Sequence, residues 1–95
     1  MNDKSFAQFE SEARARGAEQ VMERRWEPGT EVRPHSHPFD ADALVVEGQM
    51  WLTVAGQTRQ LGPGDTFAIP RGVEHSERYG ERGATFWVGR RTAAS

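Results

Sequence analysis

The chain contains no cysteine, which excludes disulfide bonds and metal sites built from thiolates. It also lacks a long apolar run, and the residues behind Met1, from Asn2 to Ser5, are polar. A secretory signal needs an apolar segment close behind the N-terminus, and a membrane-spanning helix needs about 20 consecutive, mostly apolar residues. We therefore expect neither feature, and we expect a cytoplasmic protein.

A strong charge of either sign is also missing, because the formal net charge of the 95 residues is −2. The 11 arginines and the single lysine are scattered among 14 acidic residues, so we expect no basic surface for nucleic acid. Hydrophobic residues make up 36% of the chain, which is little for a domain whose size already limits what it can bury. A second copy would bury more apolar surface, and we therefore expect a homodimer.

One short helix is predicted near the N-terminus, within residues 3–17. Ser5 and Gln8 have the spacing of a capping box, in which each side chain bonds the backbone N–H of the other residue. The residues that follow show helical spacing of apolar side chains and then a glycine stop: Phe6, Phe9, Ala13 and Gly17. We expect the narrow apolar stripe to cover an open end or a side of the remaining fold.

After this helix the pattern changes to short alternating segments separated by turns. About eight such segments, with turn signals roughly every ten residues, are typical of an all-β sandwich or barrel. We predict a single antiparallel β domain over residues 19–90, a tail at 91–95, and a solvated end at Arg90 and Arg91. The clearest segments are 20–26, 43–47, 49–55, 66–69, 74–79 and 84–89, with a tight hairpin turn at Gly56 and Gln57.

Three histidines are present, and they fall into two segments of the chain. His35 and His37 are two residues apart, so on a strand their side chains would share one face. His75 lies 40 positions beyond His35, behind a turn that contains proline and glycine. Neutral imidazole is the commonest protein metal ligand. Three imidazoles brought together would hold one ion and leave positions open for a substrate or water.

Both histidine segments carry further residues at regular spacing. The first reads Gly-x5-His-x-His-x10-Gly over residues 29–48, and the second reads Gly-x5-Pro-x-Gly-x2-His over residues 64–75. Together they resemble, in the same order, the two motifs of the cupin superfamily. The resemblance implies a small antiparallel β-barrel, or jelly roll, that holds a metal or ligand inside through the histidines of both motifs.

Two positions depart from the family pattern. In the family a glutamate follows the second histidine after three residues and supplies a fourth ligand, whereas here Ala41 occupies that position. Asp40 and Asp42 flank it, but strand alternation should turn both away from the face of Ala41 unless a bulge re-aims one of them. The second motif usually ends in asparagine, which Tyr79 replaces. The resemblance thus implies three histidine ligands, with Asp40, Asp42 or Glu77 as alternatives for a fourth.

Glu77 follows His75 by two residues and should share its inward face. Its carboxylate would then act as a fourth ligand, as an acceptor that orients a histidine, or as a general base. The alternative is a carboxylate at the rim of the barrel that pairs with Arg78 or Arg82. Glu77 and Tyr79 are the residues that we expect to assist proton transfer if the site is catalytic.

Such a site is compatible with several classes of function. The three-histidine set resembles that of the iron(II) dioxygenases among cupins, which implies a metal-dependent enzyme acting on a small oxygenated substrate. The expected cofactor is one divalent ion of iron, zinc, nickel, manganese or copper, with iron(II) favoured for an enzyme. The alternatives are a non-catalytic module that binds or senses a small molecule, and a barrel that keeps the histidines without using them.

Overall fold

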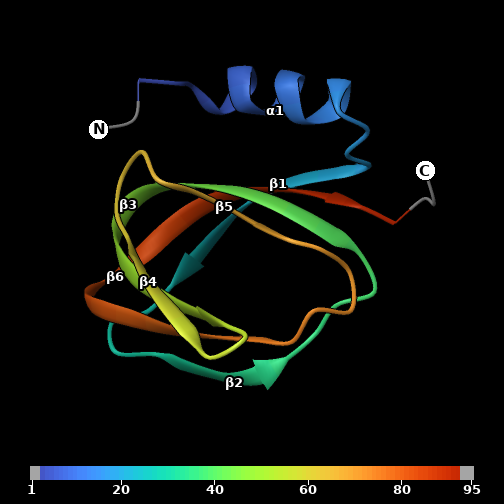
Figure 1. Ribbon diagram of the computed structural model, residues 1–95. Coiled ribbons are helices and arrows are strands. Elements are labelled where there is room, and N and C mark those ends of the chain that lie inside the picture. The colour runs from blue at the N-terminus through green and yellow to red at the C-terminus, as the bar shows by residue number, and fades with distance from the viewer. Residues whose placement is uncertain (1–2, 93–95) are drawn as a thin grey trace.

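A computed structural model describes residues 3–92 of the chain (Figure 1). One helix precedes six strands, and every strand pairing is antiparallel. The elements are α1 (Phe6–Ala15), β1 (Gln20–Trp26), β2 (Glu31–His35), β3 (Asp40–Val54), β4 (Gln57–Leu61), β5 (Thr66–Ile69) and β6 (His75–Arg91). The structure therefore confirms the predicted all-β fold with a short N-terminal helix.

The two long strands, β3 and β6, run side by side through the whole molecule and belong to two layers at once (Figure 1). In one layer β1 pairs with the second half of β6, and β5 pairs with the first half of β3. In the other layer β2 pairs with the first half of β6, and β4 pairs with the second half of β3. One hydrogen-bonded sheet is thus folded over on itself, with its interior between the layers.

The separate segments predicted at 43–47 and 49–55, and at 74–79 and 84–89, are each one continuous strand in the structure. The pairing of β3 with β6 shifts register between Val45 and Glu47 and again between Gly48 and Met50. Such bulges bend a strand without ending its pairing. The glycines that interrupt the sequence pattern therefore mark a bend rather than a strand end.

The bend brings backbones so close together that only glycine fits. Gly48 has φ +76°, and a Cβ atom built on it would lie 2.1 Å from the carbonyl oxygen of Gly83. Gly83 has φ +70°, and its Cβ would lie 2.2 Å from the carbonyl oxygen of Trp26. Glycine alone tolerates both the positive φ and this close approach. The fold-over of the sheet therefore depends on two glycines on different strands.

Apolar side chains from both layers fill the interior. On β3, Met50 and Leu52 point inward and are 0% and 3% exposed, as the alternation of this strand predicts. Val45, Leu61 and Tyr79 are also almost fully buried. Removing a side chain of this size from water stabilises the fold by about 1.5–3 kcal/mol. These residues belong to one apolar core between the two layers.

Helix α1 packs on the outside of the layer that contains β1, covering a side of the sheet rather than an open end (Figure 1). Its predicted capping box is present, with Ser5 and Gln8 bonding each other's backbone N–H. Phe9 packs against Leu44 and Trp87 from the outer faces of β3 and β6. The helix therefore closes a second, smaller apolar cluster and leaves the interior between the layers untouched.

The hairpin between β3 and β4 turns one residue earlier than predicted. Ala55 and Gly56 form the turn, with φ +52° and +77°, and Gln57 already pairs with Val54. Positive φ at both central residues is what a two-residue turn with the right twist requires. Ala55 adopts a positive φ that is strained for a residue with a side chain. The sequence therefore predicted correctly that Gly56 lies in the turn, but not that the turn begins at Ala55.

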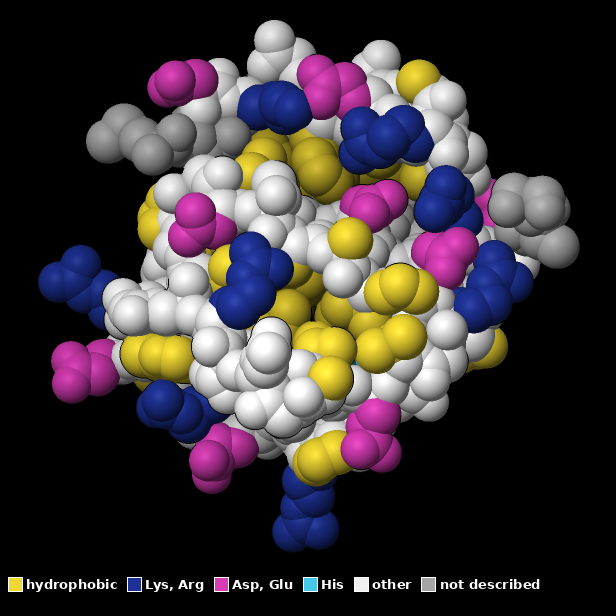
Figure 2. Space-filling view, viewed as in Figure 1, with side chains coloured by type: hydrophobic (Ala, Val, Ile, Leu, Met, Phe, Trp, Pro, Cys, Tyr) yellow, Lys and Arg dark blue, Asp and Glu magenta, His cyan; other side chains and the backbone are white. Residues whose placement is uncertain are grey.

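The surface seen in Figure 2 carries acidic and basic side chains interspersed, with no broad patch of one sign. The histidine side chains are almost hidden in this view. Within residues 3–92, no helix is long and apolar enough to cross a membrane.

The Gly48→Ala substitution should strongly destabilise the protein, because its methyl group would collide with backbone atoms of Gly83 that cannot move without breaking the bend. Gly29→Ala is the matched control, since Gly29 has φ +72° but no atom within 4 Å of the added Cβ. We expect the control to lose about 1–2 kcal/mol from the positive φ alone, and Gly48→Ala to lose clearly more. Urea unfolding of both variants measures the difference, and equal losses would show that the close approach does not matter.

Candidate metal centre

The three histidines meet at one end of the interior, although they come from distant parts of the chain. His35 is the last residue of β2 and pairs directly with His75, the first residue of β6. His37 follows just after β2 in an irregular segment. One ligand nitrogen from each ring lies within 4.8 Å of the other two. The structure therefore places three imidazoles where they can bind a single metal ion.

Backbone carbonyl groups orient two of these rings. Nδ1 of His35 donates a hydrogen bond to the carbonyl oxygen of Arg33 at 2.8 Å, and Nδ1 of His75 donates to that of Val73 at 3.0 Å. A proton held on Nδ1 leaves the lone pair on Nε2, the nitrogen that would bind metal. Both strand ends thus select the ring tautomer that a metal ligand needs.

The third ring, that of His37, is held by stacking. It lies nearly parallel to the ring of Phe39, with centroids 4.6 Å apart. Burial lowers the pKa of His37, and the neighbouring His35 and His75 lower it further. A lower pKa keeps the imidazole neutral at physiological pH, which is the form that binds a metal ion.

Glu77 reaches into the same cluster from β6. Its Oε2 lies 3.7 Å from Nε2 of His35 and 3.9 Å from Nε2 of His75, and its side chain is 9% exposed. Two ligands of one ion at about 2.1 Å each can be at most about 4.2 Å apart. The Glu77 carboxylate is therefore close enough to share an ion with both histidines. Arg78, the alternative rim partner, stacks on Trp51 instead, at 4.1 Å.

Tyr79 holds the Glu77 side chain through a hydrogen bond. Its hydroxyl donates a hydrogen bond to Oε1 of Glu77 at 2.7 Å, and its ring stacks on that of Trp26 with centroids 5.1 Å apart. Burial raises the pKa of Tyr79 well above its usual value, and the charge of Glu77 raises it further. The phenol therefore keeps its proton at physiological pH and can donate it in the hydrogen bond to Glu77.

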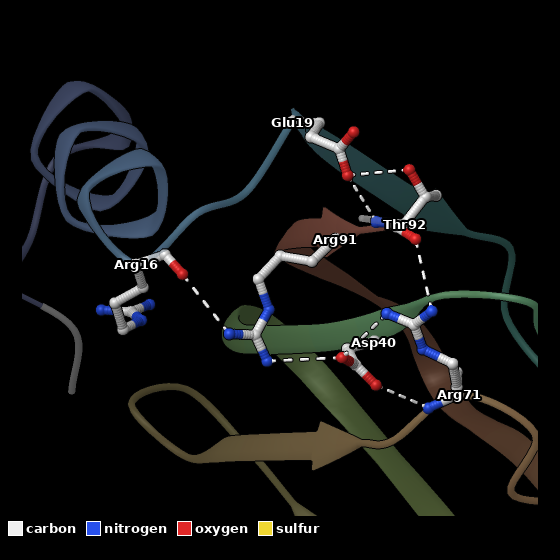
Figure 3. Close-up of polar contacts among 6 residues, drawn as sticks. All are labelled: Arg16, Glu19, Asp40, Arg71, Arg91 and Thr92. Atoms are coloured by element: carbon white, nitrogen blue, oxygen red, sulfur yellow. Dashed lines mark hydrogen bonds and ion pairs between the residues drawn. The ribbon is translucent and has the colours of Figure 1, made fainter. Parts of the chain in front are cut away.

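Neither aspartate that flanks Ala41 joins the histidines. Ala41 points inward, as strand alternation predicts, and is 8% exposed. Asp40 points the other way: one carboxylate oxygen accepts a hydrogen bond from the backbone N–H of Arg71 at 2.8 Å, and the other forms ion pairs with Arg71 and Arg91 (Figure 3). Asp42 lines a hollow beneath helix α1. The carboxylate in the cluster therefore comes from β6 and not from β3.

The cluster opens into a small cavity of about 120 Å³ between the two layers. Apolar and aromatic side chains form most of its wall, and two arginines, Arg24 and Arg90, complete it. The sequence predicts a solvated end at Arg90 and Arg91, but β6 continues to Arg91 and keeps Arg90 on its inward face. The alternation of side chains along a strand could have predicted this, because Arg90 lies two residues beyond the buried Val88 and therefore shares its face.

Comparison with known proteins agrees with this fold. No curated protein matches the chain. Among solved structures, KdgF from Halomonas sp. is similar at a TM-score of 0.70 and 24% identity, over 79% of this chain and 69% of that one. An RmlC-like cupin from Shewanella frigidimarina NCIMB 400 is similar at a TM-score of 0.70 and 25% identity, over 80% and 68% of the two chains.

Oxalate decarboxylase from Bacillus subtilis, in its W96Y form, is similar at a TM-score of 0.69 and 25% identity, over 75% of this chain and 20% of that one. The family model described as "Cupin domain" matches residues 22–88, which include both histidine segments and all six strands in whole or in part. The chain therefore belongs to the cupin domain family.

Proposed function

We propose that this protein binds one divalent transition metal ion through His35, His37 and His75, with Glu77 as a fourth ligand, and acts as a metal-dependent enzyme on a small oxygenated molecule. The observation that carries this proposal is the convergence of three imidazole nitrogens beside one internal cavity, with the buried Glu77 carboxylate within 3.9 Å of two of the rings. With iron(II) as the ion, the activity would be that of a mononuclear dioxygenase.

A metal ion held there would polarise an oxygen atom of the substrate or, as iron(II), activate dioxygen. The protein's own residues prepare the site for that chemistry. Glu77 contributes one negative charge beside three neutral imidazoles and so offsets part of the charge of a divalent ion. The hydrogen bond from Tyr79 holds that carboxylate in place. Phe67 and Phe86, whose rings pack edge to face at 5.4 Å, form part of an apolar wall that limits access of water.

Similar structures support an enzyme over a purely structural barrel. One of them is named as an oxalate decarboxylase, which acts on a small oxygen-rich molecule. The cavity of about 120 Å³ is suited to a ligand of that size class, because it is below the usual range of about 300–1,000 Å³ for drug-sized ligands.

Replacing either of two metal-binding histidines should abolish metal binding. We expect near-stoichiometric metal in the wild type purified without a histidine tag, and little in His35→Ala or His75→Ala. Asp40→Ala is the control: it removes a nearby carboxylate that faces away from the cluster, so metal content should be unchanged while the melting temperature falls by a few degrees. Elemental analysis decides the matter, and a wild type that stays metal-free after reconstitution would rule the proposal out.

Tyr79→Phe should weaken metal binding by roughly 10–100-fold, because the partner that orients Glu77 is lost. The ring and its stacking on Trp26 are retained, so the fold should survive. Ser76→Ala, on the outward face of the same strand, serves as the control and should leave affinity unchanged. A competition assay with a chromophoric chelator measures both, and equal affinities for wild type and Tyr79→Phe would mean that the hydrogen bond from Tyr79 to Glu77 does not contribute to metal binding.

Oxygen uptake tests the dioxygenase activity directly. The wild type reconstituted with iron(II) should consume dioxygen with at least one member of a panel of small diketones and thiols, and Glu77→Gln should slow that reaction. His75→Ala should abolish it. Tight binding of a panel member without any turnover would instead indicate the alternative, a non-catalytic binding or sensing module.

The homodimer and the cytoplasmic location expected from the sequence stay predictions. The half-buried Trp51 on the outer face of the layer that contains β2 supports the first, because a second copy could cover that face. Light scattering in solution measures the number of copies.

A further inference from the structure

Two arginines share the cavity with the histidines, and the established family motifs account for neither. Arg24 lies on β1 and Arg90 near the end of β6, and both line the cavity on the inward face of the sheet. Within residues 3–92, no carboxylate lies within ion-pairing distance of either guanidinium group. Two positive charges thus face one small enclosed space without a countercharge bonded to them.

Cation–π contacts hold both guanidinium groups near the proposed metal ligands. Arg90 lies over the ring of Phe39 at 4.6 Å, and Phe39 in turn stacks on His37 at 4.6 Å. Arg24 lies over Trp26 at 5.0 Å, and Trp26 stacks on Tyr79, the residue that bonds Glu77. A cation–π contact does not use up the N–H donors of a guanidinium, which stay available to an acceptor.

Two residues that line the cavity carry a hydrogen-bond donor without an acceptor. Nε of Arg90 and Nε1 of Trp26 are buried and have no hydrogen-bond partner in the described part of the chain. Both groups can only donate, so what they lack is an oxygen atom that accepts. Burial lowers the pKa of Arg90, and the charge of Arg24 lowers it further, as expected for cations that no anion compensates. A buried donor without an acceptor is unfavourable, and a bound ligand would relieve it.

The missing acceptor would come from an anionic ligand, and the size and walls of the cavity limit which anions fit. One water molecule in the liquid takes up about 30 Å³, so a cavity of about 120 Å³ holds a ligand of roughly four to six heavy atoms. The apolar wall suits a short carbon chain. Glu77 already brings a negative charge into the same space, which disfavours a multiply charged oxyanion such as phosphate. A planar carboxylate matches the fork of donors that guanidinium presents.

We propose that Arg24 and Arg90 form a carboxylate-binding subsite beside the metal centre, and that the ligand is a short monocarboxylate with a second oxygen function that faces the histidines. This inference rests on the proposed function for its account of the second oxygen, whereas the carboxylate contact depends on the arginines alone. It names a substrate class, the short oxo or hydroxy acids, for which Arg24 and Arg90 are the specificity-determining residues.

Calorimetric titration with pyruvate and its neutral amide, pyruvamide, tests the subsite. The zinc-loaded protein avoids turnover, and the metal-free protein is titrated in parallel. We expect the wild type to bind pyruvate at least about tenfold more tightly than pyruvamide, and Arg24→Gln and Arg90→Gln each to lose about tenfold or more for pyruvate alone. Arg25→Gln is the matched control, on the same strand but exposed on its other face, and should behave as the wild type.

Zinc content and thermal melts identify any arginine variant that fails to fold. If one does, the corresponding Arg→Lys variant replaces it; lysine keeps the charge but not the fork, and should retain only part of the preference for pyruvate.

Selective, arginine-dependent binding of pyruvate by metal-free protein that takes up no zinc would uphold the subsite and reject the proposed metal function. Zinc binding with no preference for pyruvate, or with a preference unchanged in both arginine variants, would overturn the subsite alone. Tighter binding of inorganic phosphate than of pyruvate would overturn the carboxylate class.

Discussion

The close approach of backbones at Gly48 and Gly83 is the constraint on which the rest of the structure depends. At that point the two longest strands bend together, so the first half of β6 lies in one layer and the second half in the other. The bend encloses an interior between the layers. It also brings both ends of β6 to the same cavity, with His75 at one end and Arg90 at the other.

In the interior that this bend encloses, backbone groups orient two of the three histidine rings of the site. Carbonyl groups next to His35 and His75 hold the Nδ1 protons and turn Nε2 inward. The carboxylate is supplied by Glu77, and the position where the family pattern has glutamate carries a methyl side chain, Ala41, on the opposite wall. The cavity therefore keeps one negative charge near the histidines and two positive charges along its wall.

The features that could be predicted from the sequence are those set by the spacing of residues within one helix or strand. The capping box at Ser5, the inward face of Met50 and the outward turn of Asp40 all follow from the period of the helix or strand in which they lie. Features set by contacts between distant parts of the chain could not be predicted in this way. The glycine at position 48 has the local appearance of a strand end, and only the pairing of β3 with β6 shows that the strand continues through a bend.

The sequence by itself determined the fold class, the two histidine segments and the strand faces, because spacing along the chain controls which side chains share a face. The tertiary structure alone decided which groups meet: that Glu77 reaches both His35 and His75, that Tyr79 holds it, and that Arg24 and Arg90 line the same cavity from different strands. These contacts depend on the register between strands and on the bend of the sheet. Both are set by packing between residues far apart in the chain, which no local pattern encodes.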